Sequence, residues 1–186
     1  MLVLALTGCA ASVGPDPAPA LQVPSTSVPG SMEMPTSAPA PVSRAGVTCR
    51  ARGVLPDPVC TPGATNPDVT TSTLRTTICK AGWAAKVRPP VSWSSRAKRA
   101  SMAAYGLTGD PSAYEFDHLI PLSLGGAPKS MLNLWPEPGS SPNRKDAVEA
   151  AAKRAVCSGA MRLSTAQNAM AKDWQTLGRR LGVSGL

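Results

Sequence analysis

The composition of the N-terminal part of the chain limits how much of it can fold. Pro, Ala, Ser and Val dominate from Ala10 to about Arg44, and hardly any bulky side chain is present for a core to bury. Such a segment cannot offset the entropy lost on ordering, so we expect residues 10–46 to form a disordered linker. About 140 residues remain, from 47 to 186, which is enough for one domain with a modest core.

Four of the five cysteines fall within this expected domain, at Cys49, Cys60, Cys79 and Cys157. They show no C-x-x-C spacing and the chain has a single histidine, which argues against a zinc cluster. We expect two disulfides, formed in an oxidising compartment, that staple an irregular proline-rich segment at the start of the domain. Four cysteines can pair in three ways, and the sequence does not choose between them.

The first nine residues favour export. The apolar run from Leu2 to Leu6 is too short to span a bilayer and is followed by small residues, as in a signal peptide. Leu6-Thr7-Gly8-Cys9 resembles a bacterial lipobox, although no basic residue precedes the apolar run. The resemblance implies that residues 1–9 are a lipoprotein-type signal segment and that Cys9 is lipidated. We therefore expect an extracytoplasmic protein, lipid-anchored to the cell membrane or secreted, with the proline-rich linker as a stiff spacer.

The positive charge is concentrated in the expected domain. All 19 Lys and Arg lie at Arg44 or later, against nine Asp and Glu there, which gives this part a formal charge of +10. A basic domain favours polyanionic partners such as nucleic acid, anionic lipid or an anionic wall polymer. The alternative is a basic surface that is simply solvated.

Hydrophobic periodicity and turn residues predict a domain of helices and short strands. Trp135 and Trp174 are expected in the core and Glu137 at the surface. The predicted helices are 69–79, 94–105, 143–157 and 164–177, and the predicted extended segments are 113–124 and 131–135, the second closed by Pro136 and Pro138.

One stretch resembles a known family. It reads Asp117-His118-Leu119-Ile120-Pro121-Leu122, then Gly125-Gly126, then Asn133-Leu134-Trp135-Pro136, and it precedes a predicted helix. This pattern resembles the ββα-metal, or His-Me finger, motif of HNH endonucleases, in an actinobacterial and actinophage branch. The match covers roughly residues 115–149. It implies an α+β fold with a ββα-metal core and additional helices.

The resemblance also implies roles for single residues. Asp117 would bind a metal, His118 would be the general base, and Asn133 would fix the loop of the β-hairpin or orient His118. The final histidine of the HNH pattern is absent, because His118 is the only histidine in the chain. A helix residue must replace it, and we rank Asp146 ahead of Asn143, with Glu149 third. Such a set of oxygen ligands favours Mg²⁺ or Mn²⁺.

Basic residues near this motif are expected to contact the nucleic acid. Lys145 or Arg144 would clamp the scissile phosphate, so Lys145 is a predicted catalytic residue. Further predicted contacts are Arg96, Lys98 and Arg99.

The sequence thus favours a metal-dependent endonuclease that acts outside the cytoplasm, on DNA in preference to RNA. The alternative hypothesis is a non-catalytic surface lipoprotein that uses an HNH-like fold to bind an anionic polymer or a protein partner.

Overall fold

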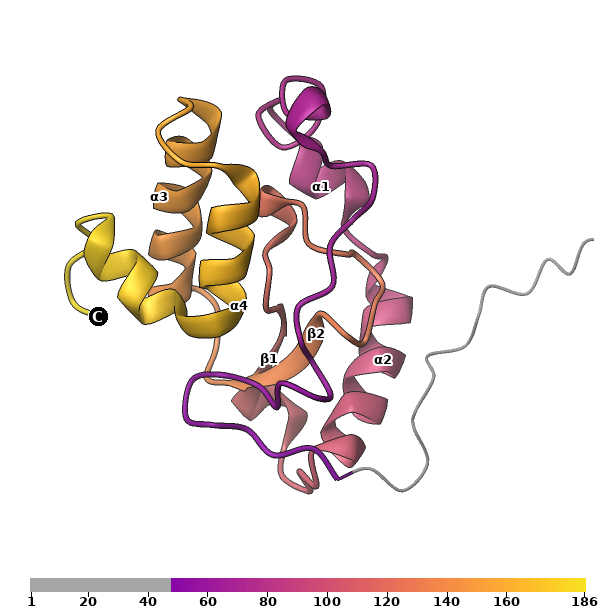
Figure 1. Cartoon of the computed structure of the whole chain (residues 1–186). Coiled ribbons are helices and arrows are strands. Elements are labelled where there is room, and N and C mark those ends of the chain that lie inside the picture. Colours follow the sequence, from indigo (N-terminus) through magenta and orange to yellow (C-terminus); the bar gives the residue numbers. More distant parts are fainter. Residues whose placement is uncertain (1–47) are drawn as a thin grey trace, which may run out of the picture. The chain divides into compact units, whose positions relative to one another are not determined.

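The computed structural model describes residues 48–186 (Figure 1). The predicted signal segment 1–9, the linker 10–46 and the lipidation site Cys9 lie outside the described residues. Within 48–186, every helix is too short or too polar to cross a bilayer. The described part contains four α-helices, three short 3₁₀ turns and one two-stranded antiparallel sheet. The predicted mixture of helices and short strands is therefore confirmed.

The beginning of the described chain has irregular backbone and is closed by a disulfide between Cys49 and Cys60. Asp57 organises this loop, because its carboxylate accepts hydrogen bonds from the backbone N–H groups of Arg50, Val59 and Cys60. The predicted stapled segment is therefore present.

The predicted helix 69–79 is wrong. The structure has a single 3₁₀ turn at Thr71–Thr73 (η1), followed by further turns up to Cys79. The threonine hydroxyls explain the difference: Thr73 Oγ1 donates to the Asp68 carbonyl at 2.8 Å and Thr77 Oγ1 donates to the Thr73 carbonyl at 2.7 Å. Side chains that bond to the local backbone in this way compete with a regular helix.

Two helices follow, α1 (Trp83–Val87) and α2 (Val91–Ala104), separated by Arg88-Pro89-Pro90. Arg88 has extended backbone, as expected for a residue that precedes proline. Pro90 is the N-cap of α2, so this helix begins before the predicted Ser94. It ends at Ala104, and Gly106 soon after it has a φ of 65°, a left-handed conformation that glycine adopts without strain.

A 3₁₀ turn at Pro111–Ala113 (η2) leads into strand β1 (Tyr114–His118), which pairs antiparallel with β2 (Leu134–Pro138). The second strand continues through Pro136 and Pro138, contrary to the prediction that these prolines close it. Leu119 N–H donates to the Asn133 carbonyl at 2.8 Å, and hydrogen-bonded pairs alternate along an antiparallel ladder. Pro136 and Pro138 therefore occupy non-hydrogen-bonded pairs, in which the residue donates no N–H to the opposite strand. Their missing N–H groups would point to the open edge of the sheet, where proline is tolerated.

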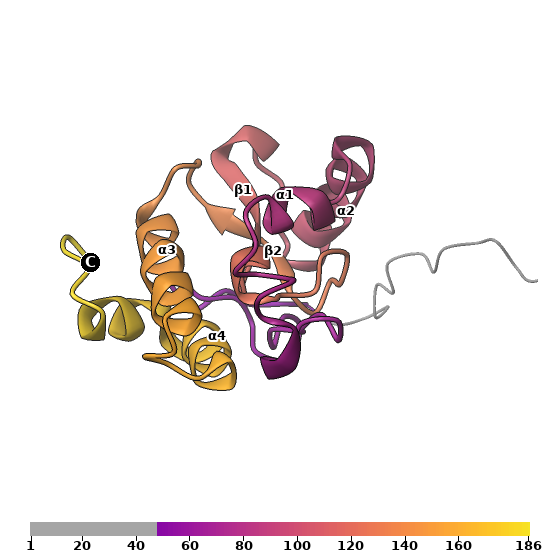
Figure 2. The same cartoon turned by 90° about the horizontal axis from the view of Figure 1, so that it is seen from above.

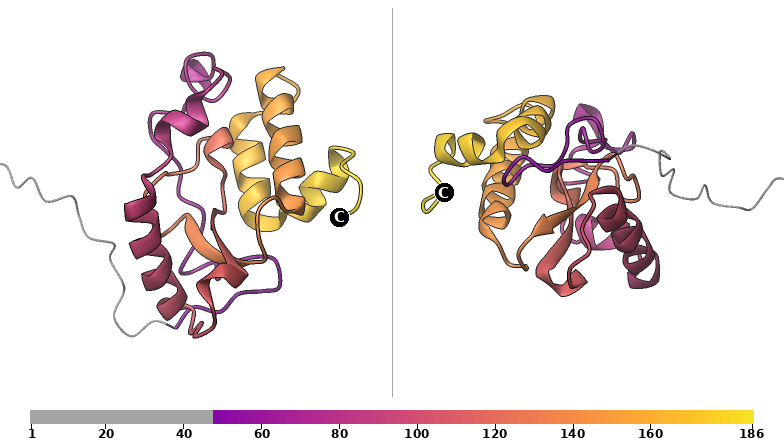
Figure 3. Two further views of the ribbon diagram at one scale, coloured as in Figure 1. Left: turned by 180° about the vertical axis from the view of Figure 1, so that it is seen from behind. Right: turned by 90° about the horizontal axis from the view of Figure 1, so that it is seen from below.

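The connection between the strands contains a third 3₁₀ turn, η3 (Leu122–Leu124), and helix α3 (Arg144–Cys157) follows β2. Helix α3 has Asn143 as its N-cap, so it agrees with the predicted helix 143–157 to within one residue. Helix α4 (Leu163–Arg180) is interrupted at Asp173, whose backbone is not helical, and its two parts point in different directions (Figure 3). Because Asp173 accepts a hydrogen bond from Thr176 N–H, it acts as a new cap for the second part.

The hydrophobic core lies between α3, α4, the loop around η3 and the segment before α1. Ile78, Leu124, Val148 and Met170 are among its fully buried members. A second disulfide, Cys79–Cys157, joins the segment before α1 to the end of α3. The two predicted disulfides are therefore confirmed, and the pairing is 49–60 and 79–157. Trp135 and Trp174 are buried, as predicted.

The β-hairpin lies between α2 on one side and the pair α3–α4 on the other, an arrangement visible from two directions (Figures 1 and 2). Successive side chains of a strand point to opposite faces. Residues 115 and 117 of β1 therefore lie on one face of the hairpin, and residues 114, 116 and 118 lie on the other. This alternation separates the functional residues that the sequence places next to each other.

Candidate active site at the end of strand β1

His118 is the last residue of β1, and its imidazole is buried. Its Nε2 atom lies 3.0 Å from the carbonyl oxygen of Pro128, in the loop that joins the strands. A carbonyl only accepts, so Nε2 carries the proton and Nδ1 keeps its lone pair in the neutral ring. Burial lowers the pKa of His118, against the opposing effects of this hydrogen bond and of the Asp117 charge. The imidazole is thus oriented and neutral at neutral pH, as a general base requires.

Asp117 points to the other face of the hairpin, where it meets Lys145 of α3. The Lys145 ammonium donates to Asp117 Oδ2 at 2.6 Å, to Glu149 Oε1 at 2.6 Å and to the carbonyl oxygen of His118 at 2.9 Å. An ammonium group has three N–H donors, so these three oxygens use all of them. The side chain of Lys145 is 2% exposed. Lys145 therefore joins the first turn of α3 to the end of β1 and has no donor left for a phosphate, which differs from its predicted role as a clamp.

Helix geometry explains why Glu149 takes part. Residues four apart share one face of a helix, so Lys145 and Glu149 meet directly. The structure accordingly pairs Glu149 with Lys145.

Two further carboxyl groups lie beside this ion pair. Glu137 of β2 is directly opposite Glu115 of β1, on the same face as Asp117. The prediction that Glu137 lies at the surface is wrong: it is 5% exposed, and its Oε2 atom has no hydrogen-bond partner among the described residues. The prediction failed because it ended the second strand at Pro136, which hid the alternation that turns Glu137 inward.

The pKa values in this group of acids follow from burial and from the single ammonium. Burial would raise the pKa of Asp117, but the Lys145 charge and hydrogen bond outweigh it and lower that pKa. Burial and the Asp117 charge raise the pKa of Glu137 to about 9, so Glu137 is protonated at neutral pH. Burial also raises the pKa of Glu149 to about 7, although Lys145 opposes this. The ammonium itself stays charged, because Asp117 and Glu149 outweigh the effect of burial and raise its pKa.

Asn133 is fully buried and fixes the loop between the strands. Its Oδ1 accepts from Ile120 N–H at 2.9 Å, and its Nδ2 donates to the carbonyls of Ile120 at 2.9 Å and Ala127 at 3.3 Å. Gly126 is needed for this contact, because a Cβ atom there would lie 1.7 Å from the Ile120 carbonyl oxygen. Of the two predicted roles of Asn133, these bonds correspond to fixing the loop. The same loop carries Pro128, so Asn133 also acts indirectly on the position of His118.

The other two predicted metal ligands form the cap of α3. Asn143 Oδ1 accepts from Lys145 N–H at 2.8 Å, and Asp146 Oδ2 accepts from Asn143 N–H at 2.8 Å, which is a capping box. Asn143 Nδ2 also donates to Glu115 Oε2 at 3.0 Å. Glu115 is half-buried, and burial, with the charges of Asp117 and Asp146, raises its pKa.

The predicted ligand set of Asp117, Asn143 and Asp146 does not fit a divalent cation in this arrangement. The Asp117 oxygen that would face the ion is occupied by the Lys145 ammonium, and the Asn143 and Asp146 oxygens are used by the helix cap. Within residues 48–186, three or more His, Cys, Asp or Glu side chains nowhere form a group arranged to hold a metal.

The predicted nucleic-acid contacts fall into two kinds. Arg96 and Arg99 are exposed on α2, and Arg144 is exposed at the first position of α3. Lys98 is different, because its ammonium donates to the Tyr114 carbonyl at 2.6 Å and so ties α2 to β1. Sequence analysis missed Arg88, an exposed residue between α1 and α2 whose charge lowers the pKa of His118. The sequence did contain a signal for this residue. Because Arg88 precedes two prolines, the chain there had to be extended and could not continue a helix.

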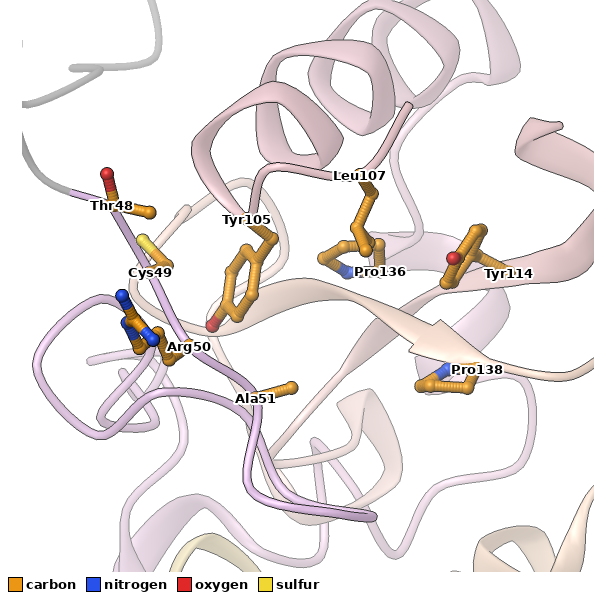
Figure 4. A pocket seen from close by; sticks show the side chains of 9 residues that line it. All are labelled: Thr48, Cys49, Arg50, Ala51, Tyr105, Leu107, Tyr114, Pro136 and Pro138. Carbon is orange, nitrogen blue, oxygen red and sulfur yellow. The ribbon is translucent and has the colours of Figure 1, made fainter. Parts of the chain in front are cut away.

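A pocket of about 280 Å³ lies elsewhere on the hairpin, near the first residues of the described chain (Figure 4). Tyr105, Tyr114, Pro136 and Pro138 form much of its wall, together with Arg50. Apart from the disulfide cysteine Cys49, none of its lining residues is among the predicted site residues, so the candidate site is defined by the side chains around the end of β1 and not by this pocket.

Comparison with known proteins adds no relative: no family model matches the chain, and no curated protein or solved structure matches it either. The functional argument therefore depends on the chemistry of the site.

Proposed function

We propose that the domain hydrolyses phosphodiester bonds of nucleic acid, DNA in preference to RNA, with His118 as general base. The observation that carries this proposal is the hydrogen bond between His118 Nε2 and the Pro128 carbonyl, which leaves Nδ1 free to accept a proton. The succession of β1, β2 and α3, with Asp117-His118 ending the first strand and Asn133 preceding the second, supports a core of the ββα-metal type.

The chemistry assigned to His118 is the activation of water. Nδ1 takes a proton from a water molecule while the oxygen of that water attacks the phosphorus. The bond from phosphorus to the leaving 3′ oxygen then breaks. The leaving oxygen takes up a proton from solvent, and the imidazolium then releases its own. Negative charge grows on the phosphate during this step, so a nearby cation stabilises it. Arg88 is the basic residue whose charge acts on His118 and whose side chain is exposed, so we assign the phosphate contact to Arg88.

The formal charge of +10 and the exposed Arg96, Arg99 and Arg144 support binding to a polyanion. The disulfides are compatible with a protein that works outside the cytoplasm. We include a surface tether through Cys9 in the proposal, on the basis of the lipobox-like sequence alone.

Plasmid cleavage by residues 47–186 tests the proposal, measured in parallel with Mg²⁺, Mn²⁺ and EDTA. His118→Gln is the informative variant, because a glutamine amide can still donate to the Pro128 carbonyl but offers no imidazole base. Loss of a general base typically lowers the rate by about 10²–10⁴-fold, and we expect a loss in that range. Asn168→Ala, an exposed change on α4, is the matched control and should cleave as the wild type does.

Equal cleavage by His118→Gln and wild type, or no cleavage by the wild type in any of the three buffers, would contradict the proposal. If the folded wild type instead retains DNA with a steep dependence on salt and never cleaves it, the domain is the non-catalytic binding protein.

A further inference from the structure

The Lys145 ammonium lies against the two residues to which the sequence assigns the first metal ligand and the general base. It contacts Asp117, the predicted first ligand, and the backbone of His118, the predicted base. It also comes from the helix that would supply the last ligand. A metal at this position would join the end of β1 to the first turn of α3. The three hydrogen bonds of Lys145 make that same connection.

We propose that Lys145 is the resident cation of this site, so that the ammonium takes the structural place of a divalent metal ion. Lys145 is thus a positioning residue: it neutralises Asp117, fixes the His118 carbonyl and holds the end of β1 in place while His118 faces the substrate. The inference rests on the proposed function in that both concern one site, but it makes a separate claim about metal binding.

The surroundings of the ammonium show why a metal would have to displace it. Lys145 is 2% exposed, and each of its N–H donors has an oxygen partner. A divalent ion at Asp117 would lie against this buried positive charge, and the two cations would repel each other strongly in a medium of low dielectric. Occupation by metal thus requires the ammonium to leave three hydrogen bonds at once.

The same surroundings predict what happens when the ammonium is removed. Asp117 and Glu149 lose their common partner, and Glu137 already presents an oxygen without a hydrogen bond to the described residues. The Asp117 and Glu149 carboxylates and the His118 carbonyl would then face the space that the ammonium leaves, and they are the hard oxygen ligands that Mn²⁺ and Mg²⁺ accept. Replacing Lys145 by a small neutral residue should therefore create a metal site that the wild type lacks.

The experiment is equilibrium dialysis of the full chain against Mn²⁺, together with its thermal midpoint Tm measured in Mn²⁺ and in EDTA. For the wild type we expect well under one equivalent of bound Mn²⁺ and the same Tm in both buffers. For Lys145→Ala we expect about one equivalent and a Tm that Mn²⁺ at ten times its Kd raises by at least about 4 °C. Lys153→Ala, on the same helix but without an ion pair to the described residues, is the control and should behave as the wild type does.

Lys145→Gln is the second variant, in case Lys145→Ala does not fold. Its amide keeps a hydrogen-bond donor and adds an oxygen ligand, so it should also gain one equivalent of Mn²⁺. One equivalent of Mn²⁺ bound by the wild type would overturn the inference, whether or not the variants fold. So would a folded Lys145 variant that binds none. Because the readout is metal binding, these outcomes are independent of whether the domain cleaves DNA.

Discussion

The two faces of the β-hairpin at its end differ in how their polar groups are satisfied. On the face of Asp117, carboxyl groups and one ammonium form a closed network in which Lys145 uses every donor. On the face of His118, one hydrogen bond to Pro128 fixes the ring and leaves a lone pair for chemistry. Two adjacent residues therefore differ: Asp117 is bound into the connection between strand and helix, whereas His118 keeps the Nδ1 lone pair on which the proposed function depends.

This difference implies that stability and activity can be changed separately. A substitution on the Asp117 face should mainly alter the free energy of unfolding, whereas a substitution of His118 should mainly alter the rate of cleavage. The following predictions test that separation, beginning with the largest expected effect.

Lys145→Met should be the most destabilising of these changes. It removes the ammonium but keeps the length of the side chain, so Asp117 and Glu149 lose their counter-charge without a large cavity being formed. Removal of one partner of a buried ion pair typically costs about 3–5 kcal/mol, and we expect a loss of about 3 kcal/mol, measured by urea unfolding at pH 7. Lys153→Met should stay within about 0.5 kcal/mol of the wild type.

The cost of Lys145→Met should also depend on pH. In the wild type the pKa of Asp117 is lower in the folded protein than in the unfolded chain. Ionised Asp117 therefore stabilises the fold at pH values above its pKa in the unfolded chain, and this contribution is lost as the pH falls through its pKa in the folded protein. The variant lacks that contribution, and the difference between the two proteins should narrow from pH 7 towards pH 4. An equal difference at both pH values would show that the charge of Lys145 is not what stabilises the end of β1.

Asn133→Ala should have the next largest effect on stability. It leaves the Ile120 N–H and carbonyl groups buried without their partners, and each such group costs about 1–3 kcal/mol. We expect a loss of about 2–3 kcal/mol in urea unfolding, together with weaker cleavage, because the loop that holds Pro128 is no longer fixed. Asn168→Ala on the surface of α4 should leave both quantities unchanged. If Asn133→Ala lowers cleavage but not stability, Asn133 acts on the substrate and not on the loop.

The smallest effect concerns the pH dependence of cleavage. A general base works only when it is unprotonated, and burial lowers the pKa of His118 below the usual 6.5. The rate should therefore stay constant as the pH falls from 8 to about 6.5 and decline only below that value. Initial rates at constant ionic strength measure this profile. A decline that begins well above pH 7 would show that a group other than His118 limits the rate.

Several features of the fold follow from short-range patterns. The helix after Asn143 could be predicted because an apolar stripe and the glycine stop at Gly159 occur within seventeen residues of Asn143, as local interactions require. The oxidised cysteines followed from the lack of metal-ligand spacing. The helix predicted over 69–79 failed for an equally local reason, because threonine hydroxyls that bond to the backbone compete with the helix.

The candidate site could be predicted only in part, because its contacts are made between residues far apart in sequence. The pattern around Asp117, His118 and Asn133 indicated where the site is and which histidine is the proposed base. It did not reveal that Lys145 is buried 28 residues away from Asp117 in sequence, or that Glu137 faces inward. A lysine at the start of a helix is normally solvated, and only a partner contributed by another element makes its burial favourable.

The sequence by itself predicted a basic domain with two disulfides within residues 47–186, with Asp117-His118 and Asn133 as its distinctive motif. The tertiary structure decided the cysteine pairing and the face on which each motif residue lies. It also decided that an ammonium, and not the predicted set of three ligands, meets Asp117. The physical reason is that strand alternation and the position of α3 against the hairpin determine which charges meet, and both depend on long-range packing.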